Sequence, residues 1–154
     1  MPDINWTGEL LILMNVVIAA VLTGFIGLER EVKDKPAGFR TNMIVGGSSA
    51  LILSLGKVLV ESYIENGLQD VIQPDPTRII EAIILGISFI GAGTILKGKG
   101  DEESKVYYLT TAATVLFSAG IGIAVALEQY VLSISATLLL LIINRLAKRL
   151  NKKV

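Results

Sequence analysis

The sequence contains no cysteine and no histidine. The lack of cysteine excludes disulfides, thiolate metal sites and cysteine nucleophiles, and the lack of histidine excludes imidazole ligands and imidazole acid–base chemistry. Charge is scarce as well, since Asp, Glu, Lys and Arg make up 18% of the residues, against roughly 25% in soluble domains. Metal chemistry is therefore limited to carboxylates, which suit hard cations such as Mg²⁺.

The few charges cancel, because 14 Lys and Arg face 14 Asp and Glu. The chain lacks the basic field that is typical of nucleic-acid-binding proteins, so we expect no nucleic-acid partner. We also expect no enzymatic activity, because no motif pairs a nucleophile with a base or gathers metal ligands. Residues 1–9 lack the basic start of a signal peptide, so we expect the first apolar segment to be retained.

Hydrophobic residues are abundant, at 52% of the chain, and they form long blocks. Residues 10–28 carry no charge and would reach about 28 Å as a helix, close to the thickness of a bilayer core. Residues 109–143 carry only Glu128 and would reach about 52 Å, which requires two crossings with a turn near that residue. We therefore predict one all-α domain, residues 1–154, a bundle of five transmembrane helices at about 10–28, 43–60, 79–96, 109–127 and 130–147.

Local signals set the expected helix ends and contacts. Thr41 is the candidate N-cap of the second span, and Asp75, which precedes a proline, is that of the third. Lys57 and Glu81 lie at similar depth on these two spans, so an ion pair between them would reduce the cost of burying either charge. Residues 64–72 are expected to form a short helix on the membrane surface or a polar loop.

The basic residues set the expected orientation, because Lys and Arg accumulate in cytoplasmic loops. With five spans and an external N-terminus, every Lys and Arg except Lys57 and Arg78 falls on the cytoplasmic side. We therefore expect the N-terminus outside the cell and a basic, cytoplasmic C-terminus.

The connector between the first two spans holds the densest motif. Glu29 and Arg30 lie where the first helix leaves the hydrocarbon, and turn-forming residues follow. The motif fits an ordinary basic connector with an ion pair, and it also fits an ordered docking or gating element. Further candidate functional residues in this connector and at the start of the third span are Lys35, Gly38, Arg40, Thr41, Asp75 and Arg78.

Small residues recur in the spans at spacings that let helix backbones approach closely in lipid. We assign them to helix packing, and the alternative is a helix broken at Gly91 to Gly93 whose carbonyls line an ion path. If a cation passes, Glu29 and Glu81 are the carboxylates best placed to bind it. The packing candidates are Gly24, Gly27, Gly91, Gly93, Thr110, Thr111, Gly120 and Gly122.

Several linked motifs, in order, resemble the membrane domain of the MgtC/SapB family. The similar segments are Gly-Leu-Glu-Arg at 27–30, Lys-Pro-Ala-Gly-x-Arg-Thr at 35–41, Asp-Pro-x-Arg-Ile at 75–79, Gly-Ala-Gly at 91–93 and Leu-Thr-Thr-Ala-Ala at 109–113. The family usually has Gly where this chain has Tyr108. Many members continue into a cytoplasmic domain, whereas we expect this chain to comprise the membrane domain alone.

The resemblance implies a five-span protein of a bacterial or archaeal inner membrane, linked to magnesium homeostasis and growth at low magnesium. It implies a role in regulating other membrane proteins, such as the proton-driven ATP synthase. The alternative is a transporter or channel for magnesium or another cation. We expect a small homo-oligomer in the lipid bilayer and no resident cofactor, Mg²⁺ being the one ion considered.

Overall fold

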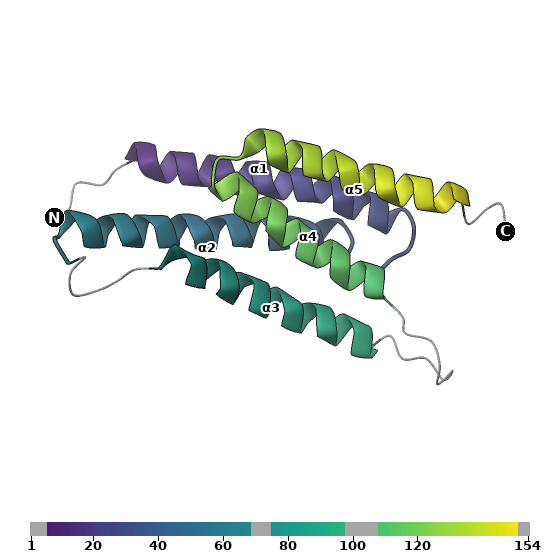
Figure 1. The fold of residues 1–154 in the computed structure, drawn as a ribbon. Coiled ribbons are helices and arrows are strands. Elements are labelled where there is room, and N and C mark those ends of the chain that lie inside the picture. Colours follow the sequence, from purple (N-terminus) through teal and green to yellow (C-terminus); the bar gives the residue numbers. More distant parts are fainter. Residues whose placement is uncertain (1–5, 69–74, 98–107, 151–154) are drawn as a thin grey trace.

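The computed structural model describes residues 6–68, 75–97 and 108–150, and these form a bundle of helices (Figure 1). The helices are α1 (Trp6–Glu31), α2 (Phe39–Glu65), α3 (Pro76–Lys97), α4 (Leu109–Ala126) and α5 (Tyr130–Leu150). No strand occurs within the described ranges. The prediction of an all-α fold is confirmed.

The helices coincide with the predicted apolar segments and extend beyond most of their ends. Helices α1 to α4 are long and apolar enough to cross a membrane, and the shorter apolar stretch Tyr130–Leu146 belongs to α5. Large apolar side chains such as Leu85, Phe89 and Val131 are more than 70% exposed, which hydrocarbon tolerates and water does not. These features support a multi-pass membrane protein.

Consecutive helices run in alternating directions, and α2 lies at the centre of the bundle (Figure 1). Helix α2 packs on α1, α3 and α4, whereas the described part of α5 contacts only α1 and α4. Much of the apolar core lies between α1, α2 and α4, and it includes Ile26, Leu53, Val115 and Ile121. The α1–α2 connector, the last turn of α3 and the last turn of α5 share one end of the bundle, which we call the connector end.

Glycines let α2 approach α1 and α4 closely. A Cβ atom on Gly122 of α4 would overlap the carbonyl oxygen of Gly46 in α2, and one on Gly46 would overlap the side chain of Thr23 in α1. A Cβ atom on Gly27 would lie 2.7 Å from the carbonyl oxygen of Gly38. Because these positions lack a Cβ atom, the backbones approach closely at the helix crossings, as is common where packing in lipid drives association.

The start of α2 differs from the prediction, because the helix begins at Phe39 and Gly38 occupies the N-cap position. The N–H of Phe39 donates to Oε2 of Glu31 at 2.8 Å. The expected N-cap, Thr41, is wrong because a carboxylate at the end of α1 supplies the acceptor that a local side chain would otherwise provide.

Helix α3 begins as predicted, directly after Asp75. The carboxylate of Asp75 accepts hydrogen bonds from the hydroxyl of Thr77 at 2.6 Å and from its N–H at 2.9 Å. These two bonds hold the pKa of Asp75 below its ordinary value. Residues 69–74 lie outside the described residues, so the expected surface helix is represented only by the extension of α2 to Glu65.

Two non-glycine residues at helix boundaries have left-handed backbone conformations. Glu128, with φ of 62°, forms the turn between α4 and α5, where the sequence predicted a break. Tyr108, with φ of 65°, precedes α4 at the position where the resembling family usually has Gly. This conformation costs a non-glycine residue about 1–2 kcal/mol, so both positions carry local strain that glycine would relieve.

Candidate functional site

The interior of the described bundle contains many polar side chains. Most of them donate to a backbone carbonyl or bridge two helices, because a polar group in hydrocarbon has no water to bond. Arg30 is the one charged member of the described set. The buried polar residues are Asn15, Thr23, Arg30, Asn42, Ser49, Ser54, Thr111, Thr114, Ser118, Ser133 and Thr137.

Arg30 lies at the connector end of α1, with 5% of its surface exposed. Its Nη2 donates to Oγ1 of Thr111 in α4. The Nε of the same guanidinium is buried without a partner in the described chain. Thr111, predicted to serve helix packing, is therefore also the acceptor for a buried cation, and two motifs 81 residues apart form one site.

Asn42 fixes the connector to the bundle. Its Nδ2 donates to the carbonyl oxygens of Ala37 at 2.6 Å and Gly38 at 2.9 Å, and its Oδ1 accepts from the hydroxyl of Ser118 in α4 at 2.8 Å. Asn42 has no exposed surface. The sequence prediction missed Asn42, although an amide directly after the connector motif and before the uncharged apolar run 43–47 was an available signal.

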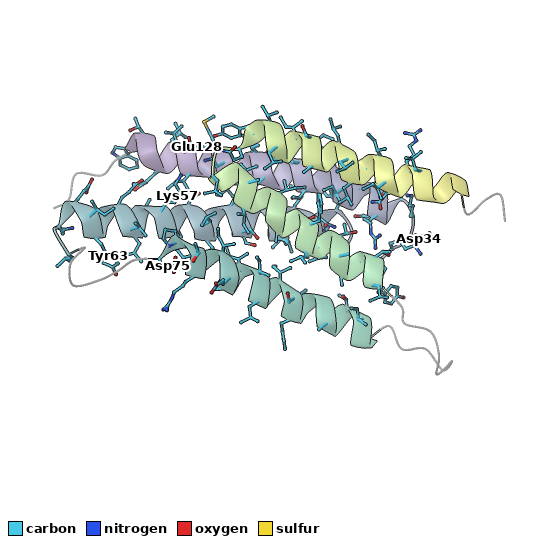
Figure 2. The ribbon with its side chains drawn as sticks, viewed as in Figure 1. Asp34, Lys57, Tyr63, Asp75 and Glu128 are labelled. Atoms are coloured by element: carbon cyan, nitrogen blue, oxygen red, sulfur yellow. The ribbon has the colours of Figure 1, made fainter. Side chains whose placement is uncertain are left out.

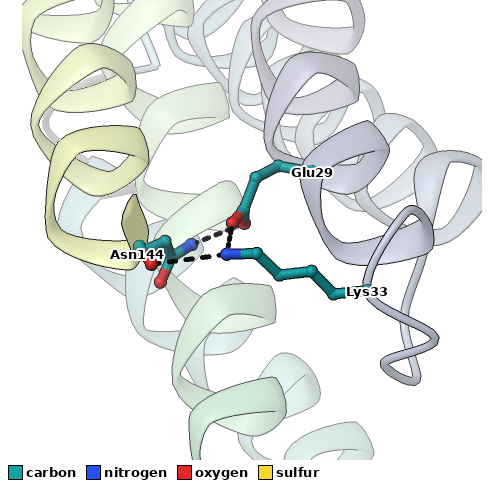
Figure 3. A network of polar contacts seen from close by, with 3 residues as sticks. All are labelled: Glu29, Lys33 and Asn144. Atoms are coloured by element: carbon teal, nitrogen blue, oxygen red, sulfur yellow. Dashed lines mark hydrogen bonds and ion pairs between the residues drawn. The ribbon is translucent and has the colours of Figure 1, made fainter. Parts of the chain in front are cut away.

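Glu29 serves a different contact, between α1 and α5 (Figure 3). Its Oε1 pairs with the ammonium of Lys33, and its Oε2 accepts from Nδ2 of Asn144 at 3.0 Å. Lys33 also donates to the backbone carbonyl of Asn144 at 3.3 Å. Glu29 and its neighbour Arg30 thus join α1 to two different helices.

Lys35, Arg40 and Thr41 are exposed side chains of the connector and the first turn of α2. They help to line an open cavity of about 390 Å³. Asp75 and Arg78, also exposed, lie at the start of α3, at the opposite end of the bundle. The structure therefore does not bring the two predicted motif regions together.

Lys57 and Glu81 do not form the predicted ion pair. Nζ of Lys57 lies 3.5 Å from Oε1 of Glu128 and donates to the carbonyl of Ala126 at 3.3 Å (Figure 2). Glu81 is exposed on α3. The prediction failed because the turn after α4 places Glu128 beside α2, an arrangement that sequence depth alone does not reveal.

A model of the MgtC family matches residues 16–153, which include every residue of the sites described above except Asn15. The chain belongs to the MgtC family. Protein MgtC of Salmonella typhimurium is 35% identical over 145 residues, covering 91% of this chain and 55% of that protein. A Haemophilus influenzae protein is 37% identical over 139 residues, covering 90% and 56%.

YhiD of Escherichia coli K12, described as a candidate magnesium transporter, is 33% identical over 131 residues, covering 85% of this chain and 58% of YhiD. The chain thus spans little more than half the length of these relatives. No solved structure gives a significant match.

The small-residue candidates of this MgtC-family chain divide into two groups. Those that face a neighbouring helix or the connector are Gly24, Gly27, Gly91 and Gly122, with Thr111 buried beside Arg30. A Cβ atom on Gly93 or Gly120 would meet nothing within 4 Å, and Thr110 is exposed. Packing inside one chain accounts for the first group and gives no role to these last three residues.

The carboxylates of the MgtC-family bundle are not gathered into a metal site within the described ranges, where no three His, Cys, Asp or Glu side chains are placed to hold an ion. Both oxygens of Glu29 accept bonds, from Lys33 and from Asn144. Glu81 is exposed on α3.

Proposed function

We propose that this MgtC-family chain is a non-catalytic regulatory protein of a bacterial or archaeal inner membrane, linked to magnesium homeostasis. The observation that carries the proposal is Arg30, because the charge buried in the described interior is a cation bonded to Thr111. A buried guanidinium repels a cation that approaches through a medium of low dielectric constant. The description of YhiD as a candidate magnesium transporter supports the link to magnesium, as does the family resemblance.

The carboxylates also favour regulation over conduction. Divalent hard cations take six or more oxygen ligands, usually including carboxylates. Glu29 is engaged by Lys33 and Asn144, and Glu81 is exposed on α3, so neither offers a free carboxylate in the interior.

We propose that the partner docks at the connector end, for which the distribution of Lys and Arg favours the cytoplasmic side in a five-span topology. Asn42 and Glu31 fix the connector, and Lys35 and Arg40 project from it. A surface that is already ordered loses little conformational entropy on binding. The partner is another membrane protein, for which the family resemblance suggests the ATP synthase, and the regulator itself acts as a small homo-oligomer.

A cation transporter is the second candidate, and one observation favours it. Asn42, Ser118 and Ser49 place amide and hydroxyl oxygens inside the bundle, and Oγ of Ser49 has no partner in the described chain. Amide oxygens are among the ligands of hard cations, so such an interior could serve as part of an ion path.

A flux assay separates the two candidates. Purified protein in liposomes that contain a magnesium-sensitive dye is expected to give no more Mg²⁺ flux than empty liposomes. Robust flux that is lost in both Glu29→Gln and Glu81→Gln would overturn the regulatory proposal.

A growth assay at low magnesium tests the docking surface. Arg40→Ala is expected to abolish the contribution of the protein to growth. The substitution removes the exposed cation and leaves the hydrogen bonds by which Glu31 and Asn42 fix the connector. Arg40→Lys keeps the charge and should retain most of the activity. Immunoblots of the membrane fraction verify equal abundance, and full activity of Arg40→Ala at that abundance would contradict docking through this residue.

A further inference from the structure

A cavity of about 450 Å³ lies between α1 and α5 at the connector end, separate from the Arg30 site. Its mouth is charged and its wall is apolar. The charged lining residues, which form the mouth, are Glu29, Lys33 and Arg145. The apolar lining residues, which form the wall, are Leu138, Leu141 and Ile142.

The charged mouth has an excess of one positive charge. Lys33 and Glu29 neutralise each other, and Asn144 donates to the second oxygen of Glu29, so this carboxylate is fully engaged (Figure 3). Arg145 is exposed and forms no ion pair with any residue that the structure describes. An anion at the mouth would therefore meet an uncompensated guanidinium and the remaining donor of the Lys33 ammonium.

The apolar wall is one face of α5. Leu138, Leu141 and Ile142 lie three and four residues apart, which places them on adjacent turns of the same side. Leu138 and Ile142 are 55% and 53% exposed, because the described part of α5 packs only on α1 and α4. The wall is therefore left for a hydrocarbon chain.

We infer that this cavity binds an anionic phospholipid, with its phosphate between Lys33 and Arg145 and an acyl chain along Leu138 and Ile142. Basic pockets between transmembrane helices on the cytoplasmic side suit such headgroups. Free phosphate would match the charges but leave the apolar wall uncovered. The inference rests on the α1–α5 cavity and does not depend on the regulatory proposal.

Lipid retention by the purified protein tests the inference. Phosphatidylglycerol and phosphatidylcholine of identical acyl chains are added in detergent, and retained lipid is counted by native mass spectrometry while the melting temperature is followed. Phosphatidylglycerol is expected to be retained and to raise the melting temperature, and phosphatidylcholine and inorganic phosphate are expected to do neither. Equal stabilisation by inorganic phosphate, or equal retention of both lipids, would overturn the inference.

Three variants locate the site. Arg145→Gln should weaken phosphatidylglycerol retention about fivefold, the equivalent of about 1 kcal/mol for one cation near an anionic headgroup. Leu138→Trp, at an exposed position, should lower retention by filling the apolar wall while keeping every charge. Arg40→Gln removes the same charge from the same end but outside the cavity, and should retain lipid like the wild type. Wild-type retention by both Arg145→Gln and Leu138→Trp, or an equal loss in Arg40→Gln, would show that the lipid binds elsewhere.

Discussion

Glu29 and Arg30 show how neighbouring residues in a helix serve different contacts. Side chains of adjacent helical residues diverge by about 100°, so the two leave α1 in different directions. Arg30 reaches Thr111 of α4, and Glu29 reaches Asn144 of α5. The sequence places both residues in one candidate functional motif. The positions of α4 and α5 determine that Arg30 is buried and that Glu29 lies at the contact between α1 and α5.

The bond between Arg30 and Thr111 yields the first residue-scale prediction. Thr111→Val keeps the side-chain shape but removes the acceptor, which leaves a buried guanidinium donor unsatisfied. We expect a loss of about 1–3 kcal/mol in the free energy of unfolding, measured as a lower melting temperature in detergent. Thr110→Val is the matched control, because that neighbouring threonine is exposed.

Equal melting temperatures for Thr111→Val and Thr110→Val would contradict the role assigned to this hydrogen bond. A lower melting temperature for Thr111→Val that Arg30→Met restores in the double variant would support it, because the unsatisfied charge is then removed as well.

At the scale of helices, α2 organises the bundle through backbone contacts. Gly46 of α2 meets Thr23 of α1, and its carbonyl meets Gly122 of α4. No hydrophobic effect drives helices together in lipid, so close packing at such crossings supplies the attraction. Helix α5 lacks a comparable crossing with α2 and packs on α1 and α4 alone within the described residues.

The α2–α4 crossing predicts opposite effects for two glycines in one helix. Gly122→Ala forces a Cβ atom onto the carbonyl of Gly46 and should cost about 1–3 kcal/mol through overpacking. Gly120→Ala meets nothing within 4 Å and should be neutral or stabilise by up to about 1 kcal/mol through helix propensity. Thermal unfolding of the two variants beside the wild type measures both effects. Destabilisation by Gly120→Ala instead would indicate that this face is covered by a second copy of the chain.

At the scale of the whole molecule, the alternation of helix directions brings the α1–α2 connector and the end of α5 to one end of the bundle (Figure 1). Lys33, Lys35 and Arg40 belong to the first of these segments or its flanks and Arg145 to the second. Lys57 lies in the second half of α2, beside Glu128, and Arg78 lies in the first turn of α3, toward the opposite end of the bundle (Figure 2). This separation is the pattern that orients membrane proteins.

The charge separation predicts the orientation in the membrane. A reporter fused after Val154 should be active in the cytoplasm, and one inserted near Asp70 should be active outside it. Fusions of alkaline phosphatase and of a fluorescent protein, each active on one side only, measure both sites. If the two sites report the same side, the five-span topology is incorrect.

The sequence by itself determined the all-α class, the approximate helix ranges, the helix start after Asp75, the turn at Glu128 and membership of the MgtC family. These features follow from hydropathy, capping chemistry and ordered motifs, which are local properties of the chain. Only the tertiary structure decided that Lys57 pairs with Glu128, that Glu31 caps α2 and that Asn42 bridges the connector to Ser118. Those contacts depend on which helices become neighbours, and helix packing in lipid is set by surface shape, which hydropathy does not encode.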